Sequence, residues 1–164
     1  MHRACAGAVW LSVRGSSLDP LPVSGLGGGG SQLVLGRVAL ASSSVCMASV
    51  AANADFGGQM RLLGYRLASD RVTLCWSAEA AMAVDYTVFV HIFDAQGKSL
   101  GAADGQPRGG LYPTSAWLPG DLVTDEHPLF LPAGASVRVG VYRLDTGERL
   151  SLEGGAETEL NLTP

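Results

Sequence analysis

The sequence has few charged residues and almost no lysine. Charged residues make up 16% of the 164 residues, Lys98 is the only lysine, and the formal net charge is −4. Nucleic-acid-binding domains carry clustered cations that neutralise the phosphate backbone. The composition therefore argues against a nucleic acid as the partner of this protein.

Cysteine is equally scarce, and the three cysteines show no pattern. Cys5, Cys46 and Cys75 lack the spacing of a metal site and cannot all pair with one another. We interpret Cys75 as a small strand residue and the other two as incidental, with a Cys46–Cys75 disulfide as an open alternative. We predict neither a metal site nor a cofactor.

Catalytic motifs are missing as well. The sequence contains no Gly-x-Ser-x-Gly elbow, no Walker phosphate loop and no His and Cys at metal-ligand spacing. A catalytic site needs a nucleophile or an acid–base group beside a positioned partner. We therefore predict no catalytic residues and expect the protein not to be an enzyme.

Residues 1–52 differ in composition from the rest of the chain. They carry three arginines and one aspartate, whereas residues 53–164 have a net charge of −6. The stretch SGLGGGGSQ (residues 24–32) has the composition of a flexible linker. The apolar stretches at 4–13 and 33–52 allow a signal-like or membrane-proximal leader, and a disordered leader is the alternative. We predict a leader over residues 1–52 and one folded domain over residues 53–164.

From residue 56 onward the chain alternates between apolar and polar residues. In RVTLCWSA (residues 71–78), Val72, Leu74 and Trp76 share one face, which is the period of a half-buried strand. DYTVFVHIFD (residues 85–94) is apolar on both faces, so we expect a central strand with both faces covered. Further strands are predicted at residues 60–67, 99–104, 121–132, 136–144, 148–152 and 156–162.

These strands predict an all-β fold. Seven or eight short strands, with a turn signal at each junction and no helical crossover, indicate an antiparallel β-sandwich, immunoglobulin-like or jelly-roll-like. Pro128 places the strand at 121–132 on a sheet edge, because proline cannot donate a ladder hydrogen bond. The predicted core comprises Trp76, Val88, Val90, Val139 and Val141.

The longest connection between strands is ADGQPRGGLYPTSAWLPGD (residues 103–121), and long loops in compact domains are often functional. As a ligand-binding loop, it would stack Tyr112 and Trp117 on sugar rings. Hydrogen bonds to sugar hydroxyls would come from three polar residues, Asp104, Gln106 and Arg108. As a structural loop, it would be stiffened by its three prolines and turned at Pro119-Gly120, with Trp117 plugging one end of the sandwich.

A second candidate site lies on a sheet face. His91 stands between Phe89 and Phe93 on one side of the strand at 85–94. We interpret it as a half-buried histidine that is hydrogen-bonded to a neighbour, and the alternative is a ligand platform that also includes Tyr142. His127, next to the edge proline, is predicted to be exposed.

Three carboxylates lie close together in the sequence at Asp121, Asp125 and Glu126. Such oxygens suit a calcium ion. Edge strands nevertheless carry charges to discourage strand addition. We favour the second explanation, in keeping with the prediction of no metal site.

Several motifs resemble a known module in order and spacing. They are DFGGQMRLLGY, VTLCW, DYTVFVHIFDAQGK, DGQPRGGLYPTSAWLPGD and VGVYRLDTGERL, over about residues 55–150. Together they resemble the C-terminal β-sandwich module of large bacterial membrane proteins described as dolichyl-phosphate-mannose-type glycosyltransferases. The chain departs from that module at Cys75, where an aromatic residue is usual, and in its leader. The resemblance implies an extracytoplasmic accessory domain without transferase chemistry, membrane-associated through a partner or the leader.

Two functions follow as predictions, and the sequence leaves the oligomeric state open. The first is a non-enzymatic extracytoplasmic accessory module that binds carbohydrate, which requires Tyr112 and Trp117 to be exposed side by side. The second is a structural subunit that docks onto a larger, membrane-associated assembly through an apolar sheet face. The predicted partner is therefore a glycan or a protein. Docking requires an exposed apolar patch around Phe89, His91 and Phe93.

Overall fold

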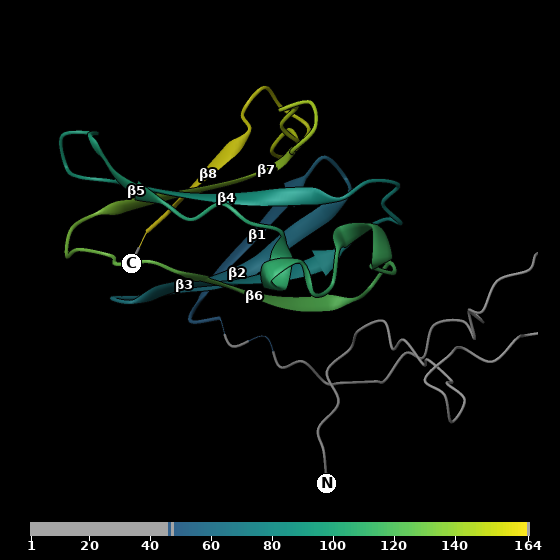
Figure 1. Ribbon diagram of the computed structural model, residues 1–164, viewed down its shortest axis with the longest axis horizontal. Helices are drawn as coiled ribbons and strands as arrows, with labels where there is room; N and C mark the ends of the chain where they lie inside the picture. Colours follow the sequence, from purple (N-terminus) through teal and green to yellow (C-terminus); the bar gives the residue numbers. More distant parts are fainter. Residues whose placement is uncertain (1–45, 47, 164) are drawn as a thin grey trace, which may run out of the picture. The chain divides into compact units, whose positions relative to one another are not determined.

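The protein is an all-β sandwich of two antiparallel four-stranded sheets, as expected from the sequence (Figure 1). The computed structural model describes Cys46 and residues 48–163. The linker at 24–32 and the apolar stretch at 4–13 lie outside the described residues, as does most of the stretch at 33–52. No helix among the described residues is long and apolar enough to cross a membrane.

Each sheet is built mainly from neighbouring hairpins. The first sheet has the order β1-β2-β3-β6, with β1 (Val50–Phe56), β2 (Met60–Ala68), β3 (Arg71–Ala78) and β6 (Leu122–Pro128). The second sheet has the order β5-β4-β7-β8, with β4 (Tyr86–Phe93), β5 (Ser99–Ala102), β7 (Ser136–Arg143) and β8 (Glu159–Leu162). Seven of these strands fall where the alternation predicts them. The strand predicted at residues 148–152 is wrong, because this stretch forms only isolated bridges, from Arg149 to Tyr142 and from Leu152 to Phe56.

Strand β1 is not predicted from the sequence, and it begins at Val50, inside the segment assigned to the leader. Its sequence, VAANADF, contains alanine, asparagine and aspartate, which are depleted in strands. Asn53 has a φ of 54°, and the pairing with β2 shifts between Ala51 and Ala54. A bulge of this kind breaks the alternation that would otherwise mark the strand.

The core lies between the sheets, where their inner faces interdigitate. All five predicted core residues are fully buried: Trp76, Val88, Val90, Val139 and Val141. Phe56 of β1 contacts Trp76 edge-on, with 5.6 Å between the ring centroids. Each fully buried large apolar side chain contributes about 1.5–3 kcal/mol, so the interface between the sheets supplies most of the stability of the domain.

The segment at residues 103–121 connects the second sheet to the first along one side of the sandwich (Figure 1). It includes two short 3₁₀ helices, η1 (Pro107–Gly110) and η2 (Thr114–Ala116). Gly105 extends the edge of the second sheet by pairing with Val88. β6 is an edge strand of its sheet and ends at Pro128, which confirms the position predicted for this proline.

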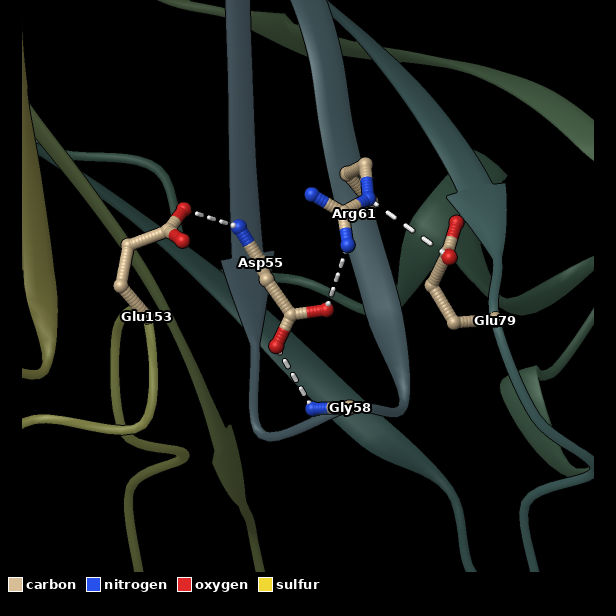
Figure 2. Close-up of polar contacts among 5 residues, drawn as sticks. All are labelled: Asp55, Gly58, Arg61, Glu79 and Glu153. Atoms are coloured by element: carbon tan, nitrogen blue, oxygen red, sulfur yellow. Dashed lines mark hydrogen bonds and ion pairs between the residues drawn. The ribbon is translucent and has the colours of Figure 1, made fainter.

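A polar network fixes the turn between β1 and β2 (Figure 2). The Asp55 carboxylate accepts hydrogen bonds from the Gly58 amide at 2.8 Å and from Arg61 at 3.2 Å. Arg61 also lies 3.6 Å from Glu79, and the Asp55 amide donates to Glu153 at 2.8 Å. Half-exposed ion pairs add about 0–1 kcal/mol each. The network therefore orients the turn and links it to the segment after β7 rather than supplying much stability.

A disulfide joins Cys46 to Cys75 on β3, which confirms the pairing left open by the sequence and corrects the interpretation of Cys46 as incidental. The residues that follow Cys46 pack closely on β2, because a Cβ at Gly64 would lie 2.7 Å from the Ala48 Cβ. The bond closes a loop over a separation of 29 residues. Chain-entropy arguments give such a crosslink about 3–4 kcal/mol of stabilisation.

Candidate functional site

The aromatic residues of the 103–121 segment face inward. Trp117 is 1% exposed and Tyr112 is 6% exposed, with 6.2 Å between their ring centroids. The Trp117 indole N–H donates to the Tyr112 carbonyl at 2.9 Å, and the Tyr112 hydroxyl donates to the Asp121 carboxylate. The plug interpretation is therefore confirmed. The prediction that these two rings stack on a sugar is wrong, because neither ring presents a face to solvent.

Local hydrogen bonds explain why this segment folds inward. Gly120 has a φ of 90°, and the Asp121 amide donates to the Leu118 carbonyl at 2.9 Å, as predicted for a type II turn at Pro119-Gly120. Upstream, the buried Thr114 hydroxyl accepts a hydrogen bond from the Tyr86 amide of β4 at 2.8 Å. These contacts satisfy polar groups within the loop and across to the second sheet, which allows the apolar rings to be sealed between them.

The three polar residues predicted to join those rings do not form one site with them. The Asp104 carboxylate is partly exposed and lies 3.2 Å from His91. Gln106 lines a hollow beside β6. The Arg108 amide donates to Asp125 at 2.8 Å. Of the five predicted ligand residues, Asp104 lines the second candidate site, on the sheet face, and lies beside His91 there.

The sheet-face residues form a layer that differs from the apolar patch predicted for docking. Phe89 is only 1% exposed, and its ring lies against Gly140 of β7, where a Cβ would come within 2.2 Å of the ring. The His91 ring lies 4.8 Å from the Phe89 ring, and the Arg149 guanidinium lies 4.6 Å above it. Phe93 is similarly covered, with the Arg138 guanidinium 4.4 Å from its centroid. The predicted exposed apolar patch is therefore wrong, because polar and cationic groups cover both phenylalanines.

A hollow of about 210 Å³ opens on this face, and we call it the sheet-face hollow. Its lining residues are Phe89, His91, Asp104, Tyr142, Gly147 and Arg149. Burial, the charge of Asp104 and a hydrogen bond to that carboxylate together raise the pKa of Tyr142 above its ordinary value of 10.0. Tyr142 is therefore a neutral phenol at physiological pH. His91 is half-buried and paired with Asp104, as the sequence predicts for a histidine with a hydrogen-bonded neighbour.

Beside the sheet-face hollow, charged side chains form a row across β7 and β8. Glu159 accepts from Arg138 at 3.0 Å and from Arg149 at 3.5 Å. Each of these arginines also lies over a phenylalanine ring. Because one carboxylate and one aromatic face hold each guanidinium, the arginines are oriented before any partner arrives.

An inward-facing acid–histidine pair occupies β6 and was not predicted. Asp125 is 1% exposed and His127 is 5% exposed, so the prediction that His127 is exposed is wrong. The alternation in LVTDEHP puts both residues on the same face as the buried Val123, and this was the signal that could have found them. His127 was predicted to be exposed because it precedes Pro128 on an edge strand. On this strand the exposed residues are the outward-facing Leu122, Glu126 and Pro128.

Both ring nitrogens of His127 have acceptors. Nε2 lies 2.7 Å from the Asp125 carboxylate and Nδ1 lies 2.8 Å from the Ala103 carbonyl oxygen. Burial alone lowers the pKa of His127, but the hydrogen bond and charge of Asp125, the Ala103 carbonyl and the charge of Asp104 together raise it above 6.5. With both nitrogens occupied, the imidazole has no free position for a substrate proton.

A second hollow, of about 290 Å³, adjoins this pair. Its lining residues are Ala103, Asp104, Gly105, Gln106, Gly109, Asp125, Glu126, His127 and Pro128. The segment around Asp104 thus borders both hollows, one on the sheet face and one beside β6.

The three carboxylates considered for calcium point to different partners. Asp121 accepts from the Leu118 amide at 2.7 Å, Asp125 is bonded within the protein, and Glu126 lies 3.5 Å from Arg71. Within the part of the chain that the structure describes, no group of three or more acidic, histidine or cysteine residues is arranged to hold a metal ion. Each of these carboxylates instead has a structural partner.

Comparisons against protein-family models, curated proteins and solved structures found no match for this chain. The resemblance to the glycosyltransferase-associated module therefore stays a prediction. The functional argument rests on the geometry of the two hollows and of the residues between them.

Proposed function

We propose that this domain is a non-enzymatic, extracytoplasmic binding module that recognises carbohydrate at the sheet-face hollow. The observation that carries the proposal is the set of side chains around that hollow. A carboxylate, an imidazole, a phenol and a guanidinium converge from Asp104, His91, Tyr142 and Arg149 above the buried Phe89 ring.

The chemistry of these groups suits sugar hydroxyls. Hydroxyls both donate and accept, so they need acceptors such as Asp104 and donors such as Arg149 and Tyr142 within one small surface. A volume of about 210 Å³ lies below the roughly 300–1,000 Å³ of pockets for drug-sized ligands. That size favours a single sugar residue at the end or side of a glycan over a large cofactor.

Three further observations support the extracytoplasmic location, the lack of catalysis and the class of the module. The Cys46–Cys75 disulfide favours an oxidising compartment, because such bonds persist outside the reducing cytosol. The commitment of both His127 nitrogens to protein acceptors favours a structural histidine over a general base. The motif resemblance supports the same class, an accessory module attached to a membrane glycosyltransferase.

The test is calorimetric titration of the full chain with mannotriose, chitotriose and cellotetraose. Arg149→Gln should weaken binding of the recognised sugar about tenfold, because a charged hydrogen bond contributes about 1.5–3 kcal/mol. Arg143→Gln is the matched control, since Arg143 is paired with Asp145 and lies outside the hollow lining. Absence of binding to all three sugars, or equal losses in the two variants, would contradict the proposal.

A further inference from the structure

His127 is held between two parts of the chain that are far apart in sequence. Its Nε2 bonds to Asp125 on the same strand, and its Nδ1 bonds to the carbonyl of Ala103, 24 residues earlier. A carboxylate and a carbonyl oxygen only accept hydrogen bonds, so each ring nitrogen must carry a proton to make both contacts. The geometry is that of an imidazolium cation.

The same contacts fix the segment that borders the sheet-face hollow. The second carboxylate oxygen of Asp125 accepts from the Arg108 amide at 2.8 Å, so Asp125 and His127 together hold this segment at two points. Asp104 directly follows Ala103, and its carboxylate reaches His91 on the sheet face at 3.2 Å. The contact at His127 is thus one residue away from a group that lines the sheet-face hollow.

The charges around His127 favour its cationic form. On β6 it faces Asp125, and from the 103–110 segment it faces Asp104, whose charges both act on the imidazole. Glu126 lines the same hollow but is paired with Arg71 of β3 on the outer surface. Arg108 of the 103–110 segment donates its backbone amide to Asp125. The charges that act on the imidazole are those of Asp125 and Asp104, and both favour the cation.

We propose that His127 is a pH-dependent clasp that, as an imidazolium, ties the Ala103–Gly110 segment, which is hydrogen-bonded to β4 of the second sheet through Ala103 and Gly105, to β6 of the first sheet. A neutral imidazole carries one N–H and cannot donate to both acceptors. The one remaining N–H stays on Nε2, where it donates to the Asp125 carboxylate, because leaving that buried charge unpaired would cost more free energy than leaving the Ala103 carbonyl without a donor. The Ala103 carbonyl then loses its donor on β6, while the backbone bonds of Ala103 and Gly105 to β4 remain. The tie between the two sheets at this point is therefore weakened as pH rises. The clasp does not depend on the proposed function.

The test is an NMR titration of the full chain without any ligand, from about pH 5 to about pH 9, the range over which histidine side chains change charge. Ring ¹⁵N shifts report the protonation of His127 and His91 separately. Backbone amide shifts of Gly105 and Arg108 report the position of the segment. We expect His127 to be doubly protonated at the acid end of the titration, to lose a proton as pH rises through its raised pKa, and both amides to shift with that midpoint.

Two results would overturn the clasp. One is a neutral His127 ring, with a single proton, over the whole pH range. The other is amide shifts that do not follow the His127 midpoint or do not change at all. His127→Gln should abolish the pH step in both amides, whereas Glu126→Gln, the outward-facing neighbour, should leave it in place. Because no sugar is present, failure of the carbohydrate proposal leaves these readouts unaffected.

Discussion

The domain contains two aromatic clusters that differ in exposure: Tyr112 and Trp117 of the loop are buried, whereas His91 and Tyr142 on the sheet face are partly exposed. In the loop cluster, Tyr112 and Trp117 direct their polar atoms to Asp121 and to a backbone carbonyl, so the whole unit is sealed. In the sheet-face cluster, His91 and Tyr142 direct theirs toward the partly exposed Asp104. The difference shows that the position of the polar partner, more than the presence of aromatic rings, decides whether a cluster is a plug or a surface.

The largest expected effect comes from removing the plug. Trp117→Ala should reduce the free energy of unfolding by about 3–5 kcal/mol, because it leaves a large cavity under the loop. Urea denaturation of the full chain measures this, and Trp117→Phe should cost less because a ring still fills part of the space. A loss below about 1 kcal/mol for Trp117→Ala, as is typical of surface sites, would contradict the assignment of the loop cluster as a buried plug.

The next effect concerns the floor of the sheet-face cluster. In Gly140→Ala, the new Cβ would lie 2.2 Å from the Phe89 ring and 2.5 Å from the Thr158 carbonyl oxygen. Overpacking of this kind costs about 1–3 kcal/mol, measurable as a lower midpoint of urea unfolding. Gly101→Ala on β5 is the matched control, because nothing lies within 4 Å of the added carbon. Equal stability of the two variants would show that Phe89 is not seated against Gly140.

The proposed His127 clasp should contribute stability in a pH-dependent way. The folded-state pKa of His127 is raised above 6.5, so its contribution is fully present below pH 6.5 and disappears as pH rises through the folded pKa. His127→Gln should therefore cost about 1–3 kcal/mol in acid and progressively less in alkaline solution. Urea unfolding of both proteins across pH measures the difference. A cost that grows with pH would reverse the sign and contradict the imidazolium assignment.

The smallest effect on stability is expected at the rim of the sheet-face hollow. Arg149 is largely exposed, and its pairings with Glu159 and Phe89 contribute about 1 kcal/mol or less. Arg149→Gln should therefore leave the unfolding midpoint nearly unchanged while weakening sugar binding. A large loss of stability would place Arg149 among the structural residues and would remove the functional contrast between the two clusters.

The sequence predicts the strands that bury one clean face and the turns that carry their own signals. Alternation placed Trp76 and Val88 in the core correctly, and Pro119-Gly120 marked its turn. Prediction from the sequence failed where the alternation is broken or where the burial of a residue depends on partners far away in the chain. Asn53 interrupts β1 with a positive φ, and the fate of Trp117 depends on contacts made only after the chain has folded.

The candidate site was less accessible from the sequence than the fold. Phe89, His91 and Tyr142 were grouped correctly by strand face, yet Arg149 was missed because it follows the turn after β7 and reaches back over the sheet. Asp125 and His127 were judged by their polarity, whereas their alternation with Val123 indicated the inward face. Polar residues on an inner face are satisfied by partners that no local pattern reveals.

The central claim is that recognition takes place on the sheet face and not at the aromatic loop. The most direct measurement is the map of backbone amide shifts in the ¹⁵N-labelled full chain during titration with the sugar that binds in the calorimetric panel. We predict that the perturbed amides cluster at His91, Asp104, Tyr142 and Arg149, while Tyr112 and Trp117 stay unchanged. Perturbations centred on Tyr112 and Trp117, or none on the sheet face, would contradict the account.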